Sequence, residues 1–368
     1  MKPGIGSKTM TTPIVSVVMS VFNGERFLAE AVESILYQDF LDFEFIIIDD
    51  GSTDDSASIL DSYQDCDARI RVYHEEHSGL VKSLNRGCEL ARGKYIARMD
   101  ADDVASKVRL ALQVSFMEAH PEIGVVGGSV EWINAVGESL YISTNPTEDG
   151  EIKADLLFRR RCAFWHPTVV LRREVFSRAG GYRCTMIGAE DYDFWLRAAE
   201  NFQLANLETV LVKYRIHSSQ VSIQRRIHQT RATLAAQLAA KRRMDGFPDL
   251  LDGVKVITSE ALVAWGISIA EQRSEVFSDY RKWIRIMCNA GEYDSALEAA
   301  REVLEEGVED VERWQAADLH LTIAQLLWRK RQFLGSATSA VHAFLLRPLV
   351  AGRPVKRLLM VRPKKIFC

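Results

Sequence analysis

No apolar run in the 368-residue chain approaches the ~20 residues that a membrane-spanning helix needs. The polar N-terminal segment lacks the apolar core of a signal peptide. The six cysteines include no C-x-x-C pair, which argues against a zinc knuckle or a disulfide framework and fits a reducing compartment. The formal net charge of −4 gives no global reason to expect nucleic acid. These absences predict a cytoplasmic protein with no nucleic-acid partner.

Several common ligand-binding motifs are also missing. The turn after the first predicted strand, residues 21–26, contains no G-x-G-x-x-G fingerprint, and no G-x-x-x-x-G-K-[ST] phosphate loop occurs. A calcium loop starting at Asp100 fails because Ala105 and Ala111 stand where glycine and glutamate are required. The segment 100–104 satisfies the D-x-D-x-[TV] pattern of aspartyl-phosphate phosphatases. In those proteins the motif usually follows the first strand, whereas here at least three predicted strands precede it.

The first ~120 residues alternate between buried strands and amphipathic helices. We predict strands at 14–21, 43–48, 70–74 and 95–99, and helices at 25–37, 52–63, 80–91 and 106–118. Such alternation predicts right-handed βαβ units and a parallel sheet. The length leaves room for two domains, and from about residue 224 the pattern is helical only.

Two of these predicted strands end in acids. The apolar run that begins at Tyr95 ends in Asp100, Asp102 and Asp103, and the second strand runs into Asp49-Asp50. In a parallel sheet both acidic ends lie at one edge, where ligands of α/β proteins bind. Capping of the next helix is the better explanation of an isolated D-x-D, but two coincident acidic edges favour a hard divalent cation of the kind that binds diphosphates.

The second half of the α/β region is less regular. We predict a strand at 166–171, a helix that begins at Glu190-Asp191 and extends to about Glu200, and a last strand at 210–216 that leads to His217. The acidic pair would lie in the first helical turn, where negative charge suits the helix dipole.

The segments 13–24, 49–54 and 97–103 resemble the family 2 glycosyltransferases, and the likeness continues through His166-Pro167-Thr168, residues 188–191 and 214–217. The resemblance covers about residues 13–222. It implies an inverting enzyme of the GT-A fold, with a mostly parallel central sheet flanked by helices and an all-α C-terminal extension. The expected domains are a disordered N-terminus at 1–12, the transferase domain at 13–222, a helical domain at 223–342 and a basic tail at 343–368.

The resemblance also implies roles for individual residues. Asp102 of the D-x-D motif would bind Mn²⁺ or Mg²⁺, and Asp191 would be the general base. His217 would lie near the metal or the diphosphate, or be structural. Asp49 would be structural, and His166 would flank the acceptor cleft or be structural. Asn85 would face the donor cleft and meet phosphate or sugar hydroxyls. The expected contacts to the nucleotide-sugar donor are Ser20, Phe22, Glu25, Asp50, Lys82 and Asp100.

The resulting functional prediction is a metal-dependent, hexosyltransferase-type enzyme. It would move a sugar from a nucleoside diphosphate sugar, most simply a UDP-sugar, to a hydroxyl of a glycan or lipid-linked acceptor in polysaccharide, glycan or glycolipid synthesis. A nucleotidyltransferase would need a glycine-rich turn with Arg and Lys after the first strand, and none is present. The alternative is a non-catalytic nucleotide-sugar-binding scaffold. His77-Ser78 departs from the family pattern, which weakens any choice of donor.

The tail at 343–368 combines seven Lys/Arg residues with leucines and contains no Asp or Glu. It is either a solvated terminus or a segment that contacts anionic lipid at the inner face of the membrane.

Overall fold

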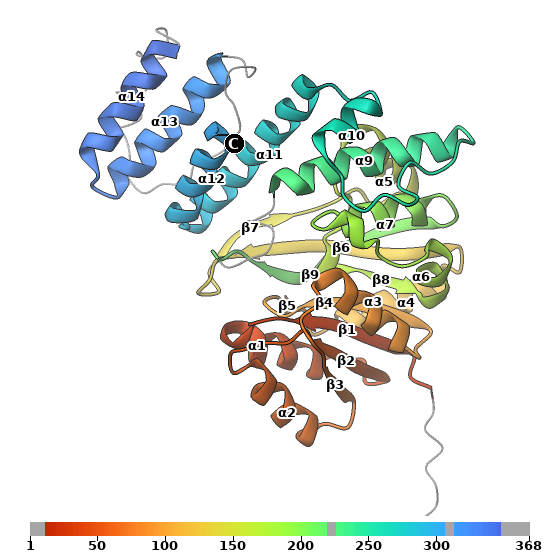
Figure 1. Cartoon of the computed structure of the whole chain (residues 1–368). Coiled ribbons are helices and arrows are strands. Elements are labelled where there is room, and N and C mark those ends of the chain that lie inside the picture. Colours follow the sequence, from red (N-terminus) through yellow and green to blue (C-terminus); the bar gives the residue numbers. More distant parts are fainter. Residues whose placement is uncertain (1–11, 219–225, 306–312, 347–368) are drawn as a thin grey trace, which may run out of the picture.

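The computed structural model describes residues 12–218, 226–305 and 313–346. A nine-stranded sheet in the order β3-β2-β1-β4-β8-β6-β9-β5, with β7 paired to β6, forms its centre (Figure 1). The predicted segment 1–12 lies outside the described residues except for Thr12, and the predicted tail is described only as far as Leu346. No helix within the described ranges is long and apolar enough to cross a bilayer.

The N-terminal half of the sheet is parallel, as predicted. Its four strands are β1 (Val15–Val21), β2 (Phe43–Asp49), β3 (Ile70–His74) and β4 (Tyr95–Asp100). The helices that follow these strands are α1 (Glu25–Leu36), α2 (Ser56–Cys66), α3 (Leu80–Leu90) and α4 (Arg109–Ala119).

The other half makes the complete sheet mixed. Strand β8 (Val170–Arg172) lies between β4 and β6 (Ile123–Ile133) and is antiparallel to both. Strand β9 (Gln203–Arg215) is parallel to β6, and the short β5 (Val104–Ala105) and β7 (Ser139–Ser143) complete the edges. The predicted strand at 166–171 is wrong in its first half, where a 3-10 turn, η2 (His166–Thr168), contains Pro167. The last strand begins seven residues earlier than predicted, at 203 instead of 210.

The two faces of β1 follow the alternation of a pleated strand. Val15, Val17 and Met19 face a core shared with α1, α2 and α4. Val18 faces the opposite core, which contains α3, α7 and α9.

The helices outside the βαβ units are α5 (Asp149–Ala154), α6 (Arg173–Ala179), α7 (Glu190–Ala199), α9 (Arg226–Met244), α10 (Ser259–Ala264), α11 (Ile269–Ala290), α12 (Tyr293–Glu305), α13 (Arg313–Arg329) and α14 (Phe333–Leu346), together with the short turns η1 (Asp155–Arg159) and η3 (Cys184–Met186).

The C-terminal region is helical, as predicted, and it packs on the sheet. Trp132 on β6 and Leu211 on β9 share a third core with Trp283 on α11 and Leu297 on α12. Helices α11 to α14 then lead away from the sheet (Figure 1).

Candidate active site

The carboxyl ends of β1, β2 and β4 place the predicted acids at one edge of the sheet. In the strand register Ser20 is the partner of Ile48 on β2 and of Asp100 on β4. The backbone N–H of Asp50 donates to the carbonyl oxygen of Val21, 2.8 Å away. Neighbouring strands are ≈ 4.8 Å apart, so the two acidic turns flank the end of β1, as the sequence predicts.

The turn after β4 concentrates three carboxylates. Oxygens of Asp100, Asp102 and Asp103 all lie within 4.8 Å of one another. The side chains of Asp100 and Asp102 are 29% and 27% exposed, whereas Asp103 is buried. The Oδ2 atom of Asp103 is buried and has no hydrogen-bond partner among the described residues. A divalent cation fits this donor set, because hard cations bind several carboxylate oxygens and would satisfy the orphaned atom.

The end of β9 holds this acidic turn in place. The Arg215 N–H donates to Asp103 Oδ1 at 2.8 Å, and the Arg215 Nε donates to the carbonyl of Asp102 at 2.8 Å. His217 Nε2 lies 2.8 Å from Asp102 Oδ2, so the structure brings together the two residues predicted as metal ligands. The two atoms are close enough for one ion to take the place of their hydrogen bond.

Burial and neighbouring charges raise the pKa values of two acids in the β4 turn. Burial raises the pKa of Asp103 well above its ordinary value, and the neighbouring charges of Asp102 and Asp100 add to this effect. Burial also raises the pKa of Asp100, and Arg98 opposes this through a direct ion pair. A bound cation would relieve the repulsion among the three acids.

Asp191 lies at the N-terminal end of α7, as predicted. The Tyr192 N–H donates to Asp191 Oδ1 at 2.7 Å, and the thiol of Cys162 lies 3.9 Å from Asp191 Oδ2. Burial raises the pKa of Asp191; the charge of Asp100 adds to this effect, and that of Arg98 opposes it. The charge of Asp100, in the β4 turn, therefore acts on the pKa of Asp191. Burial, together with the charge of Asp191, raises the pKa of Glu190 to about 7.

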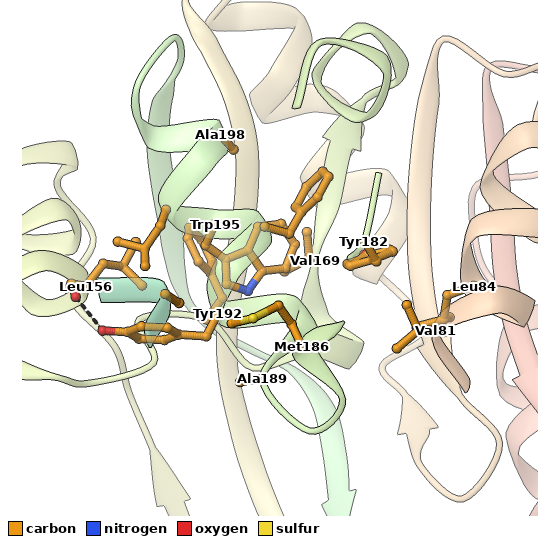
Figure 2. Packing of buried hydrophobic residues seen from close by; sticks show 14 of the residues in the cluster. Val81, Leu84, Leu156, Val169, Tyr182, Met186, Ala189, Tyr192, Trp195 and Ala198 are labelled. Carbon is orange, nitrogen blue, oxygen red and sulfur yellow. Dashed lines mark hydrogen bonds between the residues drawn. The ribbon is translucent and has the colours of Figure 1, made fainter. Parts of the chain in front are cut away.

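The packing of α7 fixes this position. The Tyr192 hydroxyl donates to the backbone carbonyl of Leu156, and Trp195 is buried in the surrounding cluster (Figure 2). Gly188, just before the helix, has a φ of +86°. A residue with a side chain would be strained at this turn, so the glycine allows the chain to enter α7 with both carboxylates in its first turn.

Hydrogen bonds link the loop after β1 to the loop after β2. The Asn23 side-chain oxygen accepts from the Thr53 N–H at 2.8 Å, and the Glu25 carboxylate accepts from the Asp55 N–H at 3.0 Å. The carboxylate of Glu25, which is predicted to contact the donor, therefore forms a hydrogen bond to the backbone of the loop after β2.

Asp50 also has structural partners. Its Oδ1 accepts from the Ser78 N–H at 2.8 Å and its Oδ2 from the Gly79 N–H at 2.9 Å, with His77 Nδ1 2.9 Å from Oδ2. The ring of His77 stacks on Phe22 with centroids 4.1 Å apart. The departure from the family pattern at residue 77 therefore adds an aromatic ring beside the end of β1.

The remaining predicted residues differ in their surroundings. Ser20 is half-buried at the end of β1, and Lys82 is exposed in the first turn of α3. The Asn85 side chain forms two 2.8 Å hydrogen bonds to the backbone of Tyr182, so it has a structural role, and its predicted donor contact stays a prediction. His166 is buried with Nε2 3.0 Å from the Tyr182 hydroxyl. Burial keeps the pKa of His166 well below its ordinary value, so the ring is neutral.

Sequence reasoning missed the arginines that support the site. Arg98 is buried on β4 and forms an ion pair with Asp100, and burial together with the Arg98 charge lowers the pKa of His166. Arg109 is fully buried, donates to the carbonyl of Arg98 at 2.8 Å, and contacts Gln113 one helical turn later. A charged residue inside an otherwise apolar strand, such as Arg98, is the sequence signal that could have identified this support.

Comparison with known proteins gives a consistent result. The model of glycosyl transferase family 2 matches residues 16–180. An uncharacterised glycosyltransferase of Haemophilus influenzae is 34% identical over 226 residues, which are 57% of this chain and 68% of that protein. The O-antigen biosynthesis glycosyltransferase WbnJ of Escherichia coli is 34% identical over 209 residues, 56% of this chain and 80% of that protein.

Among solved structures, the mannosyltransferase PcManGT from Pyrobaculum calidifontis, in complex with GDP-Man and Mn²⁺, has a TM-score of 0.50 at 17% identity. The match covers 91% of this chain and 87% of that one, and it shows a shared GT-A-like fold.

Proposed function

Because this chain belongs to glycosyl transferase family 2 and is a glycosyltransferase, we propose that it moves one sugar from a nucleoside diphosphate sugar to a hydroxyl acceptor, with metal help and inversion. The observation that carries this proposal is the cluster of three carboxylates after β4, in which one buried oxygen lacks a partner among the described residues. This group of acids suits a metal-bound diphosphate, and the separate carboxylate of Asp191 suits a proton acceptor.

The proposed donor site lies at the edge formed by β1, β2 and β4. Asp102 and His217 would hold Mn²⁺ or Mg²⁺, and Asp100 would contact the ribose. The bound cation would supply positive charge to the departing diphosphate. The structural neighbour PcManGT is bound to GDP-Man and Mn²⁺, which supports a nucleotide-sugar donor and a metal. A UDP-sugar is the first donor to test, and a GDP-sugar is the second.

The proposed chemical step is a single displacement. The acceptor oxygen attacks the anomeric carbon as the bond from that carbon to the diphosphate oxygen breaks, and the acceptor proton passes to Asp191. The electron pair of the broken bond leaves with the nucleoside diphosphate. Attack from the face opposite the leaving group inverts the anomeric configuration. The raised pKa of Asp191 suits this task, because a stronger base accepts the proton more readily.

The proposed acceptor is a glycan or a lipid-linked sugar, in polysaccharide or glycolipid synthesis. This extends to our chain what the name of its E. coli relative says, namely O-antigen biosynthesis. We also propose a cytoplasmic site of action, since the described cysteines are free thiols.

Donor binding and turnover test the proposal together. UDP and GDP would be titrated calorimetrically with and without Mn²⁺, and a panel of nucleotide sugars would be assayed for slow donor hydrolysis. We expect metal-dependent binding of one nucleotide and turnover of one of its sugars. Binding without turnover of any donor or acceptor would favour the scaffold alternative, and no nucleotide binding would refute both.

A matched pair of variants makes the test specific. Asp191→Asn should retain nucleotide binding and lose turnover. The control Asp65→Asn, an exposed acid on α2, should retain both.

A further inference from the structure

Helix α14 packs on the protein with its small residues. Ser336 and Ala343 are its buried side chains. The Ser336 hydroxyl donates to the backbone carbonyl of Ala324 on α13 at 2.8 Å. A Cβ atom at Gly335 would lie 3.2 Å from Leu327 Cδ1, so the glycine permits a close approach of the two helices. The close approach to α13 is therefore made on the side of α14 that carries its small residues.

Those bulky residues point away from the protein. We define the α14 face as Phe333, Leu334, Val341, Phe344 and Leu345, all of which are exposed. Leu334 is 89% exposed and Leu345 69%. At 100° per residue these five side chains fall on one continuous stripe of about 120°. Trp328, at the end of α13, is also half exposed and packs edge-on against Phe333 with centroids 4.9 Å apart.

The α14 face is open in the described structure. Helix α14 is the last helix in the row α11 to α14, and no other element of the described ranges lies beyond it (Figure 1). Soluble proteins seldom expose a continuous apolar stripe of this kind without a partner.

The charges that flank the α14 face in the sequence favour an anionic partner. Helix α14 itself contains no Asp, Glu, Lys or Arg. The run Arg329-Lys330-Arg331 precedes it, and residues 347–368, which follow it directly, contain seven Lys/Arg and no Asp or Glu. An apolar stripe with Trp and Phe at one end, flanked by cations in the sequence on both sides, is typical of a helix that lies in an anionic membrane interface.

We propose that the α14 face docks on an anionic lipid bilayer, with α14 parallel to the membrane plane. The helix has 14 residues, fewer than the ~20 needed to span a bilayer, so it would lie in the interface. A two-fold dimer through the same face would bring two strongly basic segments together, which like-charge repulsion disfavours. This inference concerns where the enzyme acts and does not depend on the proposed sugar transfer.

Vesicle binding by the full chain tests the proposal. Sedimentation would use vesicles of phosphatidylcholine alone and of phosphatidylcholine mixed equally with phosphatidylglycerol. We expect binding to the anionic vesicles that weakens as salt is raised. The variant Val341→Ser/Leu345→Ser should bind about tenfold more weakly, because two apolar side chains no longer enter the interface.

The matched control is Val136→Ser/Leu41→Ser, which removes a valine and a leucine of similar exposure, 75% and 70%, elsewhere on the surface. It should bind vesicles like the unchanged protein. Equal binding by the two double variants, or no binding to anionic vesicles by the unchanged chain, would overturn the proposal. So would a concentration-dependent dimer that only the α14 variant abolishes, because a second copy would then cover the face. Nucleotide binding, measured on the same samples, should be unchanged in both variants, which separates this test from that of the proposed reaction.

Discussion

The two acidic turns at the edge of the sheet look alike in sequence and differ in the structure. After β2, Asp49 and Asp50 are buried, and their oxygens accept hydrogen bonds from backbone N–H groups of Ser52, Ser78 and Gly79. After β4, three acids lie against one another, and one buried oxygen lacks a partner among the described residues. In the β2 turn the fold satisfies the buried carboxylates, whereas in the β4 turn it leaves the buried Oδ2 atom of Asp103 without a partner among the described residues.

The largest expected effect concerns the carboxylate coupled to the β4 turn. Replacement of Asp191 by Asn removes the proposed proton acceptor, so the rate of sugar transfer should fall by about 10²–10⁴-fold. Nucleotide binding should stay within about twofold, since Asp191 does not belong to the donor turn. Steady-state kinetics and calorimetry measure the two quantities. Transfer at the original rate would move the base to another residue.

The next effect tests the β4 turn itself. Asp102→Asn removes a proposed metal ligand, and we expect a loss of transfer of about 10²–10³-fold. Part of this activity should return at higher Mn²⁺ concentration, because the remaining ligands still bind the ion weakly. Assays across a Mn²⁺ series measure the rescue. An unchanged rate and an unchanged Mn²⁺ optimum would show that the turn is structural, like the β2 turn.

The third prediction compares how one substitution in each turn changes the free energy of unfolding. Asp50→Asn replaces an oxygen that accepts from Gly79, and the partly buried N–H left unpaired should lower the free energy of unfolding by about 1 kcal/mol. Asp103→Asn should instead raise it by roughly 1 kcal/mol without metal. That variant keeps the acceptor for Arg215 and gives Asp100 and Asp102 a donor in place of a repelling charge. Urea unfolding in EDTA measures both changes. Two changes of the same sign would contradict the contrast between the turns.

The smallest effect is the pH dependence of turnover. Burial raises the pKa of Asp191 and raises that of Glu190 to about 7. A base must be ionised to act, so turnover should decrease as the pH falls through these raised pKa values, by about tenfold per unit below the break. The break should lie above the ordinary carboxylate range of about 4.

Glu190→Gln separates the two carboxylates in that pH profile. If Asp191 is the base, this variant keeps its turnover, and that turnover still decreases as the pH falls. If the variant loses turnover altogether, Glu190 is the base.

The sequence predicted the parallel half of the sheet and its acidic edge, because buried runs and turn residues are local signals. The supporting contacts were not predictable in this way. Arg215 reaches Asp103 across 112 positions of the chain, and Asn85 bonds to Tyr182 across 97. The sequence predicts a strand that overlaps β8, but its antiparallel insertion between β4 and β6 depends on distant partners and leaves no local signal. Whether an acid is satisfied or unsatisfied depends on such distant partners, so the sequence alone could not distinguish the two turns.

The central claim is that the β4 turn, and not the β2 turn, binds a cation. Direct titration of Mn²⁺, with free Mn²⁺ measured by electron paramagnetic resonance in the presence of UDP or GDP, tests it most directly. We predict one bound ion per chain, with affinity at least about tenfold lower in Asp102→Asn and unchanged in the exposed-acid control Asp65→Asn. Equal Mn²⁺ affinity in all three proteins would contradict the account.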